Sequence, residues 1–439
     1  MFRHIPHSVL TVINRLRQAS HQAYIVGGAV RDALLKRPVT DWDVATSADT
    51  RTIRRIFRDK RCVVLQHHTV TVVNSGEHIE VTPFRGTEKS LSGDLSRRDF
   101  TINAMAVDME RDALIDPHGG RRDIQLKQIR AVHNPVARFQ EDPLRLLRAI
   151  RLQAELTYGF ETETSAALSA MAPLITSAAP ERIREEILKI LMSRKPSTAF
   201  NILRRTGLLT HLMPELLEGY LKRQNSYHRH TVFKHTLETV DRVAPEPALR
   251  VAALLHDIAK PRVRTKTGGV WRFYDHEKES AKMAETILGR MRFSKAFSTK
   301  ATHLIRHHLI GYTPEWSDAA VRRLIRRVGR KEIPDLLALR RADLATHACR
   351  ESALKELDVL EKRINTELSA APPLGLKDLR INGRTVMTVT GMPQGPEVGR
   401  ILKGLAETVL EKPALNTEKK LVEILMQARF PGSEEKNKS

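Results

Sequence analysis

The stretch YIVGGAVRDALLKRPVTDWDVAT, residues 24–46, decides the fold predicted for the N-terminal part of the chain. An apolar run over residues 23–26 ends in Gly27 and Gly28, and an amphipathic segment follows. This is the pattern of a strand, a tight turn and a helix. Glycine at the turn lets the backbone come close to a bulky group. The stretch therefore predicts an α/β unit with an approachable turn.

Two aspartates, Asp41 and Asp43, stand one residue apart, just before a segment that looks extended from Val44. Side chains on a strand alternate between faces, so both carboxylates would point the same way, about 6–7 Å apart. Like charges so close are costly unless a cation lies between them, and hard oxygen ligands select Mg²⁺. Either motif alone would be an ordinary turn or a pair of solvated acids. Together, in this order, they favour magnesium-assisted phosphate chemistry.

The charge balance of the chain indicates a polyanionic partner. Its 439 residues include 73 Lys and Arg against 51 Asp and Glu, a formal net charge of +22, which suits nucleic acid. A membrane surface is the alternative, but no apolar run reaches the roughly 18 residues of a spanning helix. Cys62 and Cys349 are the only cysteines, which excludes a disulfide framework and a zinc knuckle. We expect a cytoplasmic protein without a membrane segment.

Three short runs rich in β-branched residues, at 62–65, 69–74 and 78–82, would complete a small mixed sheet with the first strand. Glu80 lies in the third run. It would be a third carboxylate beside the two aspartates if the strands are neighbours, and a solvated strand residue otherwise. The apolar stretch at 101–108 has a helix-like pattern, and everything from about residue 165 onward is helix-patterned.

Six motifs carry a family resemblance: GGAVRD from residue 27, DWD from 41, RRDFTINAMA from 97, DPHGG from 116, EDPLRLLR from 141 and ERIREE from 181. In this order they resemble the bacterial-type (class II) tRNA nucleotidyltransferase and poly(A) polymerase family. The resemblance implies an α+β fold: a polymerase-beta-like head with a small mixed sheet, then an all-helical neck, body and tail. It also implies transfer of CMP, and perhaps AMP, from CTP and ATP to the tRNA 3′ end, with release of pyrophosphate.

The resemblance also implies roles for individual residues. Asp41 and Asp43, joined by Glu80, would hold two Mg²⁺ ions that activate the RNA 3′-hydroxyl and bridge the triphosphate. The residues assigned to nucleotide binding are Gly27, Gly28, Arg31, Arg97, Arg98, Asp99, Asn103, Asp142, Arg145, Arg148 and Arg182. The two glycines and Arg31 are expected at the triphosphate. The Arg-Arg-Asp motif is expected at phosphate and ribose, with Asn103 supporting it.

Base selection would fall to Asp142 and Arg145, which we expect side by side on one helix. A carboxylate accepts a hydrogen bond from the exocyclic amine of C or A and repels the oxygen that U or G presents there. Arg182 would lie on the helix that supports this pair. Asp142 precedes Pro143, so an ordinary helix N-cap is the structural alternative, and the two roles are compatible.

One segment departs from the family pattern. Only eleven residues, GTEKSLSGDLS at 86–96, separate Phe84-Arg85 from Arg97-Arg98, where many CCA-adding members carry a longer flexible loop. The shortening resembles members that add only CC. The family resemblance as a whole predicts CCA-end synthesis, and the short segment makes CC addition a serious variant. A poly(A) polymerase is less favoured, because such relatives usually carry longer basic extensions.

A second constellation predicts a divalent-metal site in the C-terminal half. It consists of His235, the adjacent pair His256-Asp257 in LLHDIAKP, and Asp343, all suitable metal ligands. The motif resembles the HD phosphohydrolase domain, which implies hydrolysis of phosphate esters in some members and an RNA-binding scaffold in others. The four ligand types favour a working site, with the metal unidentified. For His276, His307 and His308 we expect chance proximity, since the chain has 18 histidines.

The predicted domains are a nucleotidyltransferase head (1–140), a helical neck and body (141–220), an HD domain (221–350), a helical tRNA-binding tail (351–431) and a disordered end (432–439). In the tail, Gly395-Pro396 opens a helix whose N-terminal amides would suit a phosphate, with a plain helix start as the equal alternative. Two rival functions remain: an HD phosphohydrolase acting on RNA ends, and a catalytically silent tRNA-binding protein. The oligomeric state is not predicted.

Overall fold

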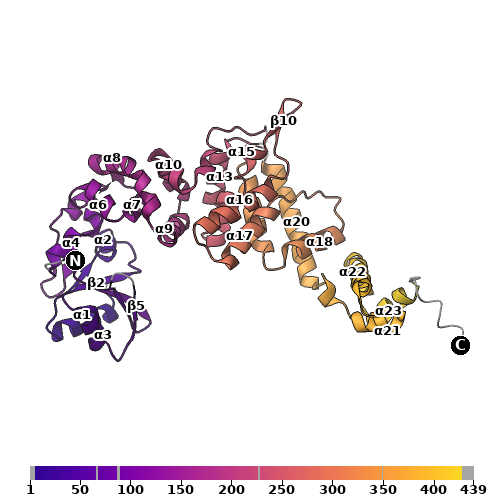
Figure 1. Cartoon of the computed structure of the whole chain (residues 1–439), viewed down its shortest axis with the longest axis horizontal. Helices are drawn as coiled ribbons and strands as arrows, with labels where there is room; N and C mark the ends of the chain where they lie inside the picture. The colour runs from indigo at the N-terminus through magenta and orange to yellow at the C-terminus, as the bar shows by residue number, and fades with distance from the viewer. Residues whose placement is uncertain (1–4, 66–67, 87–88, 226–227, 349, 428–439) are drawn as a thin grey trace. The chain divides into compact units, whose positions relative to one another are not determined.

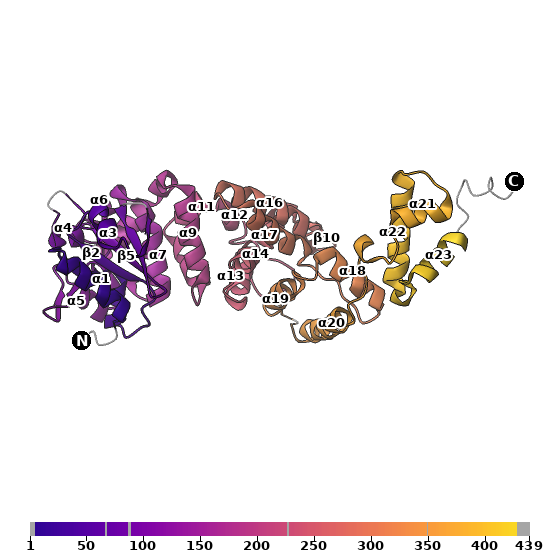
Figure 2. The same ribbon diagram turned by 90° about the horizontal axis from the view of Figure 1, so that it is seen from below.

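The computed structural model describes residues 5–65, 68–86, 89–225, 228–348 and 350–427 (Figures 1 and 2). The chain divides into two compact units, Met1–Pro214 and Glu215–Ser439, and each is described by itself. The predicted disordered end, 432–439, lies outside the described residues, as does Cys349. None of the helices in the described ranges is long and apolar enough to cross a bilayer.

The first unit is built on a seven-stranded mixed sheet in the order β3-β4-β5-β2-β1-β6-β7. Its strands are β1 (Ala23–Val26), β2 (Trp42–Thr46), β3 (Arg61–Val64), β4 (Val70–Asn74), β5 (Glu77–Pro83), β6 (Ala106–Asp108) and β7 (Ala113–Ile115). Strands β2 and β5 run parallel, and the other neighbouring strands of this sheet are antiparallel. The predicted α+β fold with a small mixed sheet is confirmed.

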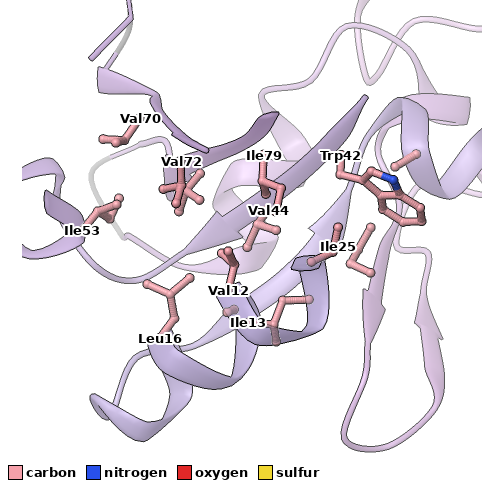
Figure 3. Close-up of a cluster of buried hydrophobic side chains, with 14 of the residues drawn as sticks. Val12, Ile13, Leu16, Ile25, Trp42, Val44, Ile53, Val70, Val72 and Ile79 are labelled. Atoms are coloured by element: carbon pink, nitrogen blue, oxygen red, sulfur yellow. The ribbon is translucent and has the colours of Figure 1, made fainter. Parts of the chain in front are cut away.

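Strand β2 places alternate side chains on the two faces of the sheet. Val44 belongs to a buried core with side chains of α1 (His7–Gln18) and α3 (Thr50–Ile56), shown in Figure 3. Asp43 therefore projects from the opposite face. Burial of the apolar face fixes the register, because a slip by one residue would exchange Asp43 and Val44.

The expectation of a helix over residues 101–108 is wrong for most of that stretch. A single 3₁₀ turn covers Thr101–Asn103, and β6 then pairs with β1 through Ile25 and Val107. A short apolar run has the same periodicity in a buried strand and a buried helix, so tertiary pairing decides between them.

Helices follow the sheet within the first unit. They are α6 (Pro135–Glu141), α7 (Leu144–Leu156), α8 (Thr162–Ala170), α9 (Pro180–Met192) and α10 (Pro196–Arg205). Asp142 lies between α6 and α7 in extended backbone, and its Oδ1 accepts a hydrogen bond from the Leu144 amide at 3.2 Å. The prediction that Asp142 and Arg145 share one helix is therefore wrong, because Asp142 caps α7 from outside.

The second unit is helical. Its main helices are α13 (Val232–Arg242), α14 (Pro247–Leu255), α15 (Lys260–Val263), α16 (His276–Arg290), α17 (Lys295–His307), α18 (Asp318–Val328), α19 (Ile333–Leu344), α20 (Arg350–Ala370), α21 (Gly383–Thr390), α22 (Pro396–Glu411) and α23 (Glu418–Gln427). A hairpin of β10 (Thr265–Thr267) and β11 (Val270–Arg272) interrupts them, which the helical pattern beyond residue 165 did not predict.

Candidate active site and metal centre

Three carboxylates meet on the face of the sheet opposite α1 and α3. The strand register aligns Val26 with Asp43 and Asp43 with Glu80, so Asp43 and Glu80 are direct neighbours on parallel strands. Asp41 stands one residue before β2. Burial raises the pKa of Asp43 against the opposing effect of Arg98. Burial also raises the pKa of Glu80, as do the charges of Asp43 and Asp41.

These three acids have no counter-charge of their own. Within the described ranges, no hydrogen bond or ion pair engages the side chain of Asp41, Asp43 or Glu80, although the chain carries a net charge of +22. Grouped oxygen ligands without a partner are what a hard cation such as Mg²⁺ requires. The donor set therefore fits a divalent cation.

Gly27 keeps the space in front of Asp43 open. Its φ of +75° lies in the left-handed region that favours glycine. A Cβ at this position would lie 3.0 Å from Asp43 Oδ2 and 2.8 Å from Arg98 Nη1. Gly28 then begins α2 (Gly28–Leu34). The turn at the double glycine thus lies directly against the carboxylates, as a close approach of the backbone requires.

Arg98 lies beside Asp43 without neutralising it. Its Nη2 is 3.0 Å from Oδ2 of the fully buried Asp94, and its Nε donates to the same carboxylate at 3.1 Å. Among the described residues Arg98 forms an ion pair with Asp94 and none with Asp43. A guanidinium held in this way leaves Asp43 available while adding positive charge next to it.

The predicted nucleotide-binding residues Arg31, Asn103, Asp99 and Arg148 form one connected network. Arg31 Nη1 donates to Asn103 Oδ1 at 2.7 Å, and Asn103 Nδ2 donates to Asp99 Oδ1 at 3.2 Å. Arg148 Nε donates to Asp99 Oδ2 at 2.7 Å. Burial alone would raise the pKa of Asp99, but the Arg148 guanidinium holds it well below its usual range.

Arg31 is buried and also donates to Asp32, so its guanidinium faces the interior rather than open space. The structure places Arg31 as a support of this network, where a direct triphosphate contact was expected.

The residues expected to choose the base are also paired. Arg182 Nη2 donates to Asp142 Oδ2 at 2.9 Å and Nη1 to Oδ1 at 3.2 Å. Arg145 Nη1 donates to Glu141 at 3.0 Å, and its Nη2 donates to the Arg97 carbonyl at 2.9 Å. The exposed Arg97 side chain lies against Gly86. The side chains of Asp142 and Arg145 are thus each held by a different neighbour.

In the second unit, the four predicted HD residues converge. His235 Nε2 lies 3.0 Å from Asp257 Oδ2, 3.2 Å from Asp343 Oδ1 and 3.2 Å from His256 Nε2. Two ligands about 2.1 Å from one ion lie roughly 3.0–3.4 Å apart. All four residues are buried. The donor set and its spacing fit one divalent metal ion.

Asp257 faces a second histidine pair with its other oxygen. Asp257 Oδ1 lies 3.2 Å from His276 Nε2 and 3.7 Å from His308 Nε2, and these three residues also meet the spacing of a metal site. Asp257 Oδ2 also lies 2.6 Å from Lys260 Nζ, so the carboxylate has a cationic neighbour on the side of the first histidine set. Chance proximity was expected for His276, His307 and His308. The structure brings His276 and His308 to Asp257, and His307 is not part of this group.

Three of these imidazoles are oriented in the same way. The Nδ1 atoms of His256, His276 and His308 lie 2.7–2.8 Å from the carbonyls of Ala253, Phe273 and Ile305, each three residues earlier. With Nδ1–H donated to a carbonyl, Nε2 presents its lone pair to the cluster, which is the usual arrangement of metal-binding histidines.

Three further residues border the cluster and were not predicted from the sequence: Lys260, His228 and His347. Lys260 Nζ lies 2.6 Å from Asp257 Oδ2, and its place three residues after Asp257 could have indicated it. His347 Nε2 lies 3.3 Å from Asp343 Oδ1. Burial and the charge of Lys260 lower the pKa of His228 to about 2. His228 lies in the loop before α13, so no helical periodicity relates it to the HD motif.

A cavity of about 560 Å³ opens onto this cluster. Its lining includes Asp257, Lys260, His276, His308, Asp343 and His347 together with residues 270–274 of the hairpin and the turn after it. The second unit therefore has a floor of charged side chains and candidate metal ligands beneath a ligand-sized opening.

Comparison with known proteins agrees with these two sites. Residues 23–130 match the Poly A polymerase head domain, residues 158–219 match the probable RNA and SrmB-binding site of polymerase A, and residues 232–347 match the HD domain.

Two relatives align along most of their length. The A-adding tRNA nucleotidyltransferase of Deinococcus radiodurans is 32% identical over 409 residues, covering 88% of this chain and 91% of that protein. The CCA-adding enzyme of Anoxybacillus flavithermus is 31% identical over 433 residues, covering 95% of this chain and 96% of that protein.

The Bacillus stearothermophilus CCA-adding enzyme, solved in complex with CTP, is similar in structure with a TM-score of 0.73 and 27% identity, covering 95% of this chain and 96% of that one. The carboxylates behind the double glycine, the HD cluster and relatives above 30% identity along nearly their whole length lead to one conclusion. The chain is a nucleotidyltransferase of the tRNA nucleotidyltransferase and poly(A) polymerase family, and it carries an HD domain.

Proposed function

We propose that this enzyme builds or repairs the CCA terminus of tRNA by adding CMP from CTP to the RNA 3′ end. The observation that carries the proposal is the group of three unpaired carboxylates, Asp41, Asp43 and Glu80, facing the open turn at Gly27. The partners are the tRNA 3′ end and nucleoside triphosphates, and the expected compartment is the cytoplasm. The tail helix that starts at Pro396 would contribute a backbone-phosphate contact.

Different residues of the chain would have different roles in the transfer. Asp41 and Asp43, supported by Glu80, would hold Mg²⁺, which lowers the pKa of the attacking hydroxyl and neutralises charge on the phosphates. The amides of the turn at Gly27 would contact the triphosphate. Arg98, fixed by Asp94, would add positive charge on the same side. The network from Arg31 to Arg148 holds the Arg-Arg-Asp segment in place for phosphate and ribose.

Base choice would use groups that exchange partners when the nucleotide binds. Asp142 would accept from the exocyclic amine of cytosine, and Arg145 would donate to its ring nitrogen and carbonyl. Arg182, which pairs with Asp142, would keep that carboxylate oriented. Uracil presents an oxygen where cytosine presents the amine, so the carboxylate would disfavour it.

We further propose that addition stops after two cytidines. Residues 90–96 of the short segment are used by the capped helix α4 (Leu91–Ser96), and Thr87 and Glu88 of the same segment lie outside the described residues. Little chain remains to form the longer loop of many full CCA-adding members.

The test supplies tRNA lacking its 3′ CCA with CTP, ATP or both, and tRNA ending in CC with ATP alone, and measures product length on a sequencing gel. We expect growth by two residues with CTP and no further growth with ATP. Growth by three would instead establish full CCA synthesis. Addition of a single A to tRNA ending in CC would establish an A-adding enzyme and overturn the proposed CMP transfer.

A second candidate function is hydrolysis of phosphate esters at the HD cluster. The observation that favours it is the shared Asp257, whose two oxygens face two histidine sets. His235 and His256, with Asp343 beside them, would complete one cation position, and His276 and His308 the other. Divalent cations there would polarise a phosphoryl oxygen and activate water. Lys260 and Arg340, which line the same cavity, would hold the phosphate.

Metal content tests the two cation positions without an activity assay. In a background of Asp41→Asn and Asp43→Asn, which removes the head site, we expect two divalent ions per chain by elemental analysis. His308→Ala should reduce this to one, because the second position loses a ligand. The control is the adjacent His307→Ala, which should retain two. An equal loss in both variants, or one ion in the parent, would contradict a second position.

A further inference from the structure

The cavity above the HD cluster has an aromatic side that the metal ligands do not explain. Aromatic residues make up 5% of the chain, yet Trp271, Phe273 and Tyr274 fall within four residues and all line this cavity. Tyr274 is 62% exposed and the neighbouring Val270 is 47% exposed. An exposed tyrosine ring and two half-buried rings beside charged side chains indicate a recognition surface.

The hairpin that carries these rings has a defined structure. Strands β10 and β11 pair through Thr265 with Arg272 and Thr267 with Val270. The two-residue turn between them is Gly268-Gly269, with φ values of +58° and +81°, which is the glycine-dependent turn that suits a tight hairpin. Trp271 is therefore presented from a short, hydrogen-bonded element, and Phe273 and Tyr274 follow it directly.

Cations already stack on these aromatic rings. The Arg264 guanidinium carbon lies 3.3 Å from the centre of the Trp271 ring, and Lys266 Nζ lies 5.6 Å from it. A guanidinium stacked at this distance helps to hold the indole ring in place. Guanidinium and aromatic planes together are the surfaces on which nucleobases stack.

The aromatic side and the metal-binding floor are directly connected. Lys260 Nζ lies 2.6 Å from Asp257 Oδ2 and 5.6 Å from the centre of the Phe273 ring. The Phe273 carbonyl lies 2.7 Å from Nδ1 of His276. A ligand with its phosphate at Lys260 would therefore have its next group against the aromatic segment. Inorganic phosphate would leave most of the cavity of about 560 Å³ unfilled.

We propose that the hairpin and the turn after it form a base-stacking platform, with Trp271 and Tyr274 as specificity-determining residues, and that the HD site takes a phosphate ester attached to a nucleoside. This inference rests on the HD hydrolase function proposed above. The ligand is either a free nucleotide or the phosphorylated 3′ end of an RNA, because both present a base and a phosphate.

The test compares binding of adenosine 3′-monophosphate and of inorganic phosphate to the metal-loaded full chain, carrying Asp41→Asn and Asp43→Asn to silence the head. We expect the nucleotide, and not phosphate, to quench tryptophan emission. Trp271→Leu should abolish the quench and weaken nucleotide binding by about 5- to 100-fold, with phosphate binding unchanged. Trp316→Leu, a partly buried tryptophan that is not part of the cavity lining, is the matched control and should bind both ligands normally.

The outcomes separate the platform from the site beneath it. If phosphate binds but the nucleotide binds no tighter, or if Trp271→Leu weakens both equally, the platform is overturned and the HD site stands. If the parent binds neither ligand, the HD function fails and the platform fails with it. A short RNA with a 3′-phosphate that shows the same dependence on Trp271 supports an RNA end as the source. Binding restricted to the mononucleotide supports a free nucleotide.

Discussion

Replacing Asp43 by Asn is expected to lower the rate of CMP addition by about 10³-fold or more. The substitution keeps the shape of the side chain and removes the charge on which cation binding depends, and a catalytic metal supplies several kcal/mol of transition-state stabilisation. Asp41→Asn should have a similar effect, and Glu80→Gln a smaller one. The rate is measured by incorporation of labelled CMP into tRNA lacking its 3′ end.

The matched control for these variants is Glu110→Gln, which removes an exposed carboxylate from the same unit. It should add CMP at the parent rate. Hydrolysis at the HD site should survive in the Asp43 variant, because the two sites use different residues. If Asp43→Asn kept addition and lost only hydrolysis, the head would be a binding module and the order of the two proposed functions would be reversed.

Replacing Asp99 by Asn is expected to destabilise the first unit by about 2–4 kcal/mol. Asp99 is buried and accepts from Arg148, Asn103 and the Phe100 amide. Losing one member of a buried ion pair leaves the other without a counter-charge, which costs about 3–5 kcal/mol when both are fully buried. The Arg148 side chain is 34% exposed, so solvent reduces that figure. Calorimetry of the full chain measures the loss.

The effect of this variant should depend on pH in a defined direction. The folded state lowers the pKa of Asp99, so its stabilising contribution is present above the ordinary carboxyl pKa of about 4 and is lost as the pH falls below it. The difference between parent and variant should therefore narrow below about pH 4. Asp59→Asn, which breaks the exposed pair with Arg15, is the control and should cost much less stability than Asp99→Asn. A constant difference at all pH values would contradict the assigned ion pair.

The sheet and the carboxylate group could be predicted because they depend on local patterns. Alternation along β2 and β5 sets the face of Asp43 and of Glu80, and Gly27 marks a turn that lies against Asp43. The convergence of His235, His256, Asp257 and Asp343 followed from the HD motif. Each of these features is encoded within a few residues or by a motif whose order is fixed.

Other features depend on contacts between distant segments and could not be read from spacing. The strand β6 was mistaken for a helix because pairing with β1 decides its conformation. The position of Arg31 is set by Asn103, which is 72 residues away. His276 and His308 are separated by most of two helices, and only the packing of α16 against α17 brings them to the same carboxylate.

The most direct test of the central claim is anomalous diffraction from crystals of the protein soaked with Mn²⁺ and CTP. The carboxylates of Asp41 and Asp43 should each lie about 2.0–2.2 Å from a manganese peak that also contacts the triphosphate. Absence of a peak at these carboxylates, or an Arg98 guanidinium paired with them in its place, would contradict the assignment of this site to nucleotidyl transfer.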